Sequence, residues 1–152
     1  MLAAGAVDTF LEVISRDPED ASVVLPAVQA LCHLLPNAKM ACLVGEKGGV
    51  PLLDKAMCEH YESEGICEVN MLLLDSLAAI PENAELMLEK EQRTVELATW
   101  IQEAWPDNNQ LAEAAAHLLR RLYNWVAVAV AVAVTATLRA DLGAAQERQL
   151  GM

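Results

Sequence analysis

Apolar residues recur along the first 123 positions at the three- and four-residue spacing of amphipathic helices. The long stripes are separated by shorter apolar segments over 37–46, 50–60, 82–90 and 94–104, which predict shorter helices. The pattern therefore predicts an all-α fold. The long stripes are Val7, Phe10, Leu11 and Ile14; Val24, Val28, Leu31 and Leu35; Ile66, Val69, Leu73, Leu77 and Ile80; and Leu111, Ala115, Leu118 and Leu122.

Two prolines bear on the start of the second helix. Asp17 followed by Pro18 has the chemistry of an N-cap and a first helical residue. Pro26 is tolerated only in a first turn, because it lacks the backbone N–H that a helix interior needs. The helix over this segment is therefore expected to begin between Ser22 and Leu25.

The segment 37–57 contains the most specific pattern in the chain. A short helix is followed by Gly48 and Gly49, which permit a sharp reversal, and then by Pro51 in the first turn of the next helix. Gly49 is expected to need a backbone conformation that other residues resist. The order of these residues resembles the corner between the first and second helices of an armadillo repeat, where the family shows an "N…I…GGIPxLV" signature.

Weaker copies of this corner lie on either side. Gly5-Ala6-Val7 lies 43 residues before Gly48-Gly49-Val50 and resembles it. Glu89-Lys90 followed by Val95 and Leu97 resembles Glu46-Lys47 followed by Val50 and Leu52, at an offset of 43 to 45 residues. A drifting period of this size is typical of stacked helical repeats. Placing a corner at Gly5 implies that the chain begins inside a repeat, and the third corner, Glu91-Gln92-Arg93, lacks the glycine pair.

The resemblance covers residues 5 to about 123 and implies a right-handed α-solenoid of about two and a half to three armadillo-like repeats. The predicted domains are an armadillo-like repeat domain over 1–123 and an apolar low-complexity helix with a polar tail over 124–152. The family implies a non-enzymatic protein–protein interaction scaffold or a structural subunit of a larger assembly. A chaperone cofactor or regulatory subunit is the alternative, and an enzyme or metal-binding module is the less favoured third possibility.

Peptide-carrying armadillo proteins present Trp and, four residues later, Asn from each third helix. Aligning the third helices of this chain places Cys32 and Asp75 at the Trp positions, and Pro36 and Ala79 at the Asn positions. The ladder is missing, so a carrier of basic import signals is not expected. The candidate partner-binding residues are instead polar positions that interrupt the apolar pattern of these helices: Gln29, His33, Asn70, Asp75, Ser76, Glu113 and His117.

Composition narrows the class of partner and the compartment. The formal net charge is −12, which disfavours nucleic acid, because phosphate binding requires clustered Lys and Arg. Hydrophobic residues make up 55 % of the chain but aromatic residues only 4 %, so the core is expected to be built from Leu, Val, Ala, Met and Ile. Four cysteines without CxxC spacing indicate small buried thiols in a reducing, intracellular and most simply cytoplasmic location.

No catalytic or cofactor constellation stands out. Cys58, His60 and Cys67 are close in sequence, but a closed zinc site needs four ligands and no second pair has suitable spacing. Glu59, Glu62, Glu64 and Glu68 form an acidic cluster, interpreted as a solvated face, with contact to a basic partner as the alternative.

The segment Trp125–Leu138 alternates Val and Ala and has no polar face at either the helical or the strand period. The favoured interpretation is a helix packed on the end of the repeats or on a partner. A transmembrane or interfacial helix is the alternative, because 17 uncharged residues separate Arg121 from Arg139 beside Tyr123. Low-complexity disorder is the third possibility. The polar ending over 146–149 is expected to be exposed and poorly ordered.

Overall fold

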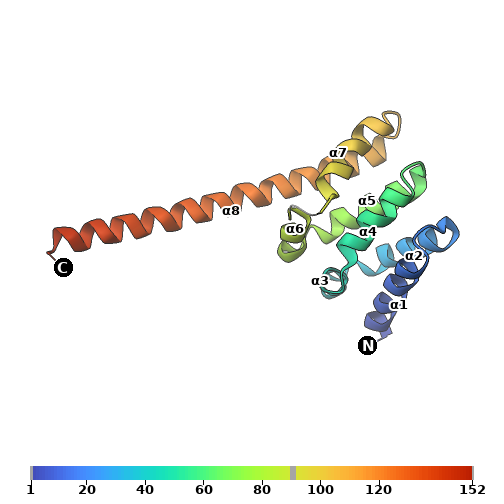
Figure 1. Cartoon of the computed structure of the whole chain (residues 1–152), viewed down its shortest axis with the longest axis horizontal. Helices are drawn as coiled ribbons and strands as arrows, with labels where there is room; N and C mark the ends of the chain where they lie inside the picture. Colours follow the sequence, from blue (N-terminus) through green and yellow to red (C-terminus); the bar gives the residue numbers. More distant parts are fainter. Residues whose placement is uncertain (1, 90–91, 152) are drawn as a thin grey trace. The chain divides into compact units, whose positions relative to one another are not determined.

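The computed structural model describes residues 2–89 and 92–151, and within these ranges the chain is all-α, with eight helices and no strand. The all-α prediction is therefore confirmed (Figure 1). The helices are α1 (Leu2–Arg16), α2 (Ala21–Leu34), α3 (Ala38–Glu46), α4 (Gly49–Glu59), α5 (Glu64–Leu77), α6 (Pro81–Met87), α7 (Thr94–Ala104) and α8 (Asn109–Gln149).

The chain divides into two compact units, Met1–Leu122 and Tyr123–Met152. The boundary falls inside α8, so the first turns of that helix belong to the first unit. The second unit is the rest of α8, which is a single unbroken helix to Gln149. The polar ending over 146–149 is exposed as expected, but it is helical rather than poorly ordered.

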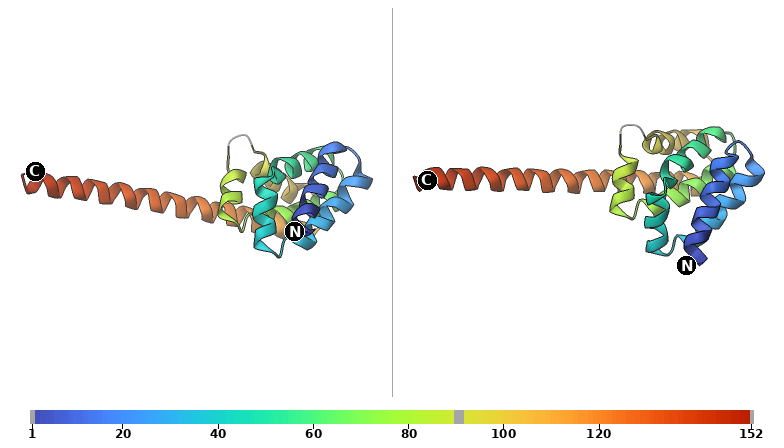
Figure 2. Two further views of the ribbon diagram at one scale, coloured as in Figure 1. Left: turned by 90° about the horizontal axis from the view of Figure 1, so that it is seen from below. Right: turned by 60° about the horizontal axis from the view of Figure 1, so that its bottom comes forward.

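Within the first unit, neighbouring helices pack in a regular order. α1 packs against α2, and α2 packs against α5 (Figure 1). The short helices α3 and α6 contact each other, as do α4 and α7, and Figure 2 shows α3 and α6 side by side. The helices α3, α4 and α5 contain 9, 11 and 14 residues, and α6 and α7, which precede α8, contain 7 and 11.

The helix starts follow capping chemistry. Asp20 caps α2, and its carboxylate accepts a hydrogen bond from the Ser22 backbone N–H at 2.9 Å. The prediction that Asp17 is the cap is wrong, and α2 also begins slightly earlier than expected, at Ala21. Pro26 therefore lies inside α2 rather than in its first turn.

The predicted corner at Gly5 is also wrong. α1 runs from Leu2 to Arg16 without a break, and Gly5 lies within it with open space where a Cβ would be. Glycine inside an exposed helix costs only about 1 kcal/mol relative to alanine, so a helix passes through it.

The corner between α3 and α4 exists, but its two glycines have different roles from those expected. Gly48 is the residue with a positive φ, 78°, in the left-handed region that favours glycine. Gly49 begins α4, and a Cβ there would contact the Val44 side chain and would lie 2.6 Å from the Val44 carbonyl oxygen. Gly49 is thus required by close packing between α3 and α4, and not by its backbone angles.

The core of the first unit is aliphatic, as composition predicted. Its largest fully buried side chains are Leu, Ile and Met, and no aromatic ring is buried among the described residues. The stripe over α8 is confirmed as a core face, since Leu111, Ala115, Leu118 and Leu122 are fully buried. Without rings, the interior gains its stability from close contact between aliphatic side chains.

Long-range polar contacts fall in a narrow range of sequence spacing. Among the described residues, the side-chain hydrogen bonds between positions more than 12 apart connect positions 35 to 46 apart. Examples are Asp54 with Thr94 and His60 with Pro18. Segments about forty positions apart are therefore tied together.

Candidate functional site

Two of the predicted contact residues meet on the first unit. Asp75 of α5 accepts hydrogen bonds from His117 Nδ1 at 2.8 Å and from Arg121 Nε at 3.0 Å, both from the first turns of α8. The Asp75 carboxylate is largely covered, whereas the His117 and Arg121 side chains are about half exposed. This cluster joins α5 to α8 and leaves donors of both basic groups facing solvent.

The remaining predicted contact residues are placed on helices α2, α5 and α8. Gln29 and His33 are exposed on α2, Ser76 is exposed on α5, and Glu113 is exposed on α8. No hydrogen bond brings these four together. Their side chains are available to a partner.

Asn70 differs from the other candidates because it is fully buried. Its amide nitrogen donates to the Ile66 carbonyl at 3.0 Å, and its buried amide oxygen has no partner. Asn70 is therefore a core residue of α5 and not part of the exposed surface.

An aromatic surface cluster was not anticipated from the sequence. Trp100 of α7 contacts both Tyr61 and Trp105 edge to face, with ring centroids 6.2 Å and 5.5 Å apart. Tyr61 follows α4, and Trp105 follows α7. Tyr61 is 52 % exposed and Trp100 is 36 % exposed, so the rings form a surface rather than a core.

Several carboxylates lie close to these aromatic residues in the sequence. Glu62 follows Tyr61 directly, and Glu103 is three positions after Trp100, a spacing that places both side chains on one face of α7. Glu64 and Glu68 accept hydrogen bonds from Asn108 Nδ2 at 2.6 Å and 3.2 Å. Two members of the acidic cluster predicted around residue 62 thus tie α5 to the residue before α8, and Glu62 is next to Tyr61 in the sequence.

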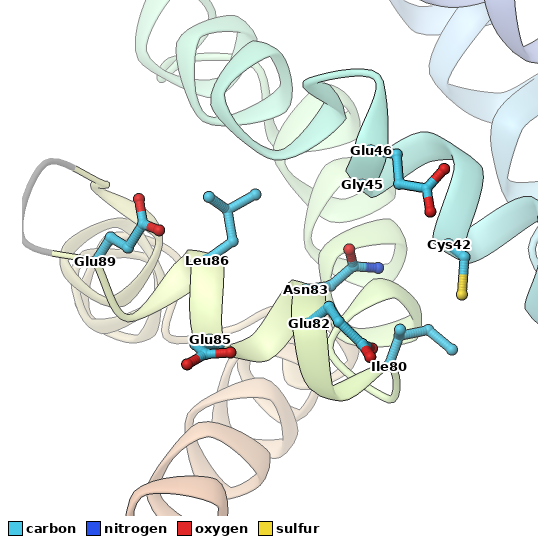
Figure 3. A pocket seen from close by; sticks show the side chains of 9 residues that line it. All are labelled: Cys42, Gly45, Glu46, Ile80, Glu82, Asn83, Glu85, Leu86 and Glu89. Carbon is cyan, nitrogen blue, oxygen red and sulfur yellow. The ribbon is translucent and has the colours of Figure 1, made fainter.

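A pocket of about 540 Å³ lies where α3 meets α6 (Figure 3). Its acidic groups come from both helices, Glu46 from α3 and Glu82 and Glu85 from α6. Glu89 adds a further carboxylate, and Ile80 and Leu86 supply the larger apolar side chains of the wall. The lining residues are Cys42, Gly45, Glu46, Ile80, Glu82, Asn83, Glu85, Leu86 and Glu89.

Asn83 holds this pocket together. Its buried amide nitrogen donates to the carbonyls of Ala41 and Leu77, both at 3.1 Å, and so links α6 to α3 and α5. A Cβ on Gly45 would overlap the Asn83 amide, which Figure 3 places beside Gly45. The glycine is therefore needed for the close approach of α3 and α6.

A second buried polar contact joins α4 to α7. Asp54 Oδ2 accepts a hydrogen bond from Thr94 Oγ1 at 2.7 Å, while Oδ1 is buried without a partner. Burial raises the pKa of Asp54 from 3.8 to about 6, against smaller opposing effects of the Thr94 hydrogen bond and of Arg93. The carboxylate is thus held in an environment that disfavours its charge.

The cysteine and histidine near residue 60 are engaged in packing. His60 Nε2 lies 2.8 Å from the Pro18 carbonyl oxygen, and Cys67 is buried with its thiol 3.7 Å from the His60 carbonyl. Burial raises the pKa of Cys32 and of Cys67 to about 11, so both thiols remain protonated at neutral pH. No group of three possible metal ligands occurs within 2–89 and 92–151.

No family model, curated protein or solved structure matches this chain.

Proposed function

We propose that the chain is a non-enzymatic armadillo-like repeat module that holds partner proteins together, as a scaffold or as a structural subunit of a larger assembly. The spacing of its polar contacts supports the repeat. Ties such as Asn83 to Ala41 and His117 to Asp75 each span 42 positions, which is close to the period of the sequence pattern. In a right-handed solenoid of stacked repeats, each unit contacts its neighbours in this way.

The observation that carries the proposed function is the exposed cluster of Tyr61, Trp100 and Trp105. The chain has three Trp, two Tyr and one Phe, and three of these six rings form one surface group while the core is aliphatic. Trp and Tyr dominate the binding energy of protein interfaces, because their large rigid rings bury much area at small entropic cost. Their use on the surface favours protein binding as the function.

The surroundings indicate the chemistry of the partner. Glu62, Glu64 and Glu103 lie beside these rings in sequence or on the same helix face, and the chain as a whole carries −12. Lys or Arg side chains are attracted both to such carboxylates and to the faces of aromatic rings. A partner that presents a basic segment fits this surface, and the residues of the Asp75 cluster provide a second contact on α5 and α8.

Crosslinking and mass spectrometry of the full chain in its native complex test the proposal. The expected crosslinks join a partner to the segments that carry Tyr61 and Trp100. Tyr61→Ala should then lower retention of that partner by roughly tenfold or more, the usual effect of removing an interface hot spot.

Tyr123→Ala is the matched control, because Tyr123 is also exposed, at 61 %, but lies in the second unit. It should leave retention of the partner unchanged, and the melting temperature of both variants should match that of the parent chain. Equal retention by the parent chain, Tyr61→Ala and a variant that lacks the Asp75 carboxylate would exclude these surfaces as the binding site.

A further inference from the structure

The apolar run of α8 that follows the buried Leu122, residues 123–138, has no burial within the second unit. Taken by itself, the second unit is one helix, with no second element against which to pack. Val126, Val130 and Val134 are 41 %, 55 % and 52 % exposed. An exposed apolar surface of this length requires cover from outside the unit.

The distribution of apolar residues around the helix identifies the kind of cover. From Val126 to Val134 every residue is Val or Ala, so the helix presents an apolar side chain in every direction. A partner protein that docks on one face leaves the opposite face in water, and such helices keep a polar stripe there. A helix that is apolar on all sides fits a medium that surrounds it.

The length and the ends of the run fit a lipid bilayer. The 16 residues from Tyr123 to Leu138 rise about 24 Å as a helix, and a thin bilayer core of about 27 Å adapts to such a length at modest cost. Arg139 at the far end can reach the headgroups, whereas Arg121 at the near end donates to Asp75 in the first unit. Tyr123 and Trp125 lie at one end, where aromatic rings favour the interface between lipid and water.

The two threonines of the run do not oppose insertion. Thr135 Oγ1 donates to the Ala131 carbonyl at 2.8 Å, and Thr137 Oγ1 donates to the Ala133 carbonyl at 3.0 Å. The hydroxyl hydrogens are therefore satisfied inside the helix, as polar groups in hydrocarbon must be. An 18-residue window of α8 has a mean hydropathy of 1.6, and none of that window is buried.

We infer that residues 123–138 form a membrane-spanning segment, which would attach the helical module to a bilayer. This inference rests on α8 alone and does not depend on the proposed function. It adopts the alternative drawn from the sequence in place of the favoured interpretation, because the helix is unbroken, apolar on every side from Val126 to Val134 and internally hydrogen-bonded at both threonines.

Flotation of the full chain with phosphatidylcholine vesicles tests the inference. The chain should float with the vesicles and should remain with them after washes in high salt and in alkaline carbonate. Val130→Arg places a charge at the centre of the run and should lower the floating fraction by about a hundredfold. Leu142→Arg, outside the run at 70 % exposure, is the matched control and should float like the parent chain.

Three results would overturn the inference. Release of the parent chain by salt or carbonate would indicate adsorption to the surface. Equal flotation of Val130→Arg and Leu142→Arg would show that the run does not enter the hydrocarbon. A parent chain that stays with a partner protein instead of the vesicles would show that protein covers the apolar run. A parent chain that sediments without lipid would show that the run is covered by self-association.

Discussion

The two halves of α8 have the same secondary structure but opposite relations to their surroundings. From Asn109 to Leu122, one face is buried in the first unit and the other carries polar residues such as Glu113 and His117. From Tyr123 to Gly151, no residue is buried, although the run up to Leu138 is more apolar. Helical geometry alone therefore does not determine what a helix packs against, and the distribution of side chains around its axis does.

The first and second units of the chain are stabilised in different ways. In the first unit, apolar side chains contribute by leaving water when the chain folds. In the second unit, folding of the isolated helix removes little apolar surface from water, so its stability depends on what surrounds it. Substitutions of the same kind should have different effects in the two units.

The largest difference is expected for matched Leu→Ala substitutions. Leu73 is fully buried in α5, so Leu73→Ala should destabilise the first unit by about 2–5 kcal/mol through the cavity that it leaves. Leu138 is 57 % exposed, so Leu138→Ala should change the free energy of unfolding by less than about 0.5 kcal/mol. Denaturant unfolding measures both values, and equal losses would contradict the division.

The next largest effect concerns pH and the buried carboxylate of Asp54. Its pKa is about 6 in the folded chain and 3.8 when it is free, so the folded chain holds more protons between these values. Stability from this group is therefore present at about pH 4 and is lost as the pH rises to about 6. The Asp54→Asn variant has no carboxyl group to titrate at this position. As the pH rises from about 4 to 6, its free energy of unfolding should therefore increase relative to that of the parent chain by about 2–3 kcal/mol.

Unfolding of both chains from pH 4 to pH 7 tests this expectation. Parallel stability curves for the parent chain and Asp54→Asn would mean that Asp54 does not titrate in this range. Thr94→Val is a useful companion, since it removes the hydroxyl that donates to Asp54 at 2.7 Å. It should destabilise the chain more at pH 7 than at pH 4.

Glycine replacements sharpen the comparison further. Gly49→Ala should cost about 1–3 kcal/mol, because the added Cβ meets Val44 in a packed corner. Gly143→Ala has open space in α8 and should instead raise helicity, with a gain of up to about 1 kcal/mol. Thermal unfolding and circular dichroism measure the two effects. If Gly49→Ala left the free energy of unfolding unchanged, close packing against Val44 would not be the reason for glycine at this position.

The smallest effect is expected at the polar surface. The Asp75–Arg121 contact at 3.0 Å involves a guanidinium that is 40 % exposed, so solvent weakens it. A double-mutant cycle with Asp75→Ala and Arg121→Ala should give a coupling of about 0.2–1 kcal/mol. A much larger coupling would make this cluster a structural tie rather than an available surface.

The sequence predicted the helices well where local chemistry determines them. The stripes became core faces, and the glycine pair marked a true corner because a left-handed residue is needed at Gly48. Local chemistry was insufficient at Gly5, since a helix tolerates glycine, and at Asp17, since Asp20 offered the same cap. Only packing distinguishes these alternatives.

The surface was harder to predict, and one error was avoidable. Asn70 lies four positions after Ile66 and three before Leu73, so the stripe already placed it on the buried face. The aromatic cluster had no comparable signal. Tyr61 and Trp100 are 39 positions apart, and they meet only through the tertiary packing of α4 against α7.

The common spacing of the polar ties has a consequence for how this chain folds and evolves. Because these contacts reach no further than 46 positions, few long loops must close before the first unit gains native contacts, which favours rapid folding. The same locality makes the architecture extensible. On the proposed repeat architecture, a duplication or loss of about one period would alter the contacts at its two borders and leave the ties elsewhere intact, so the length of the proposed binding surface could change without redesign of the interior.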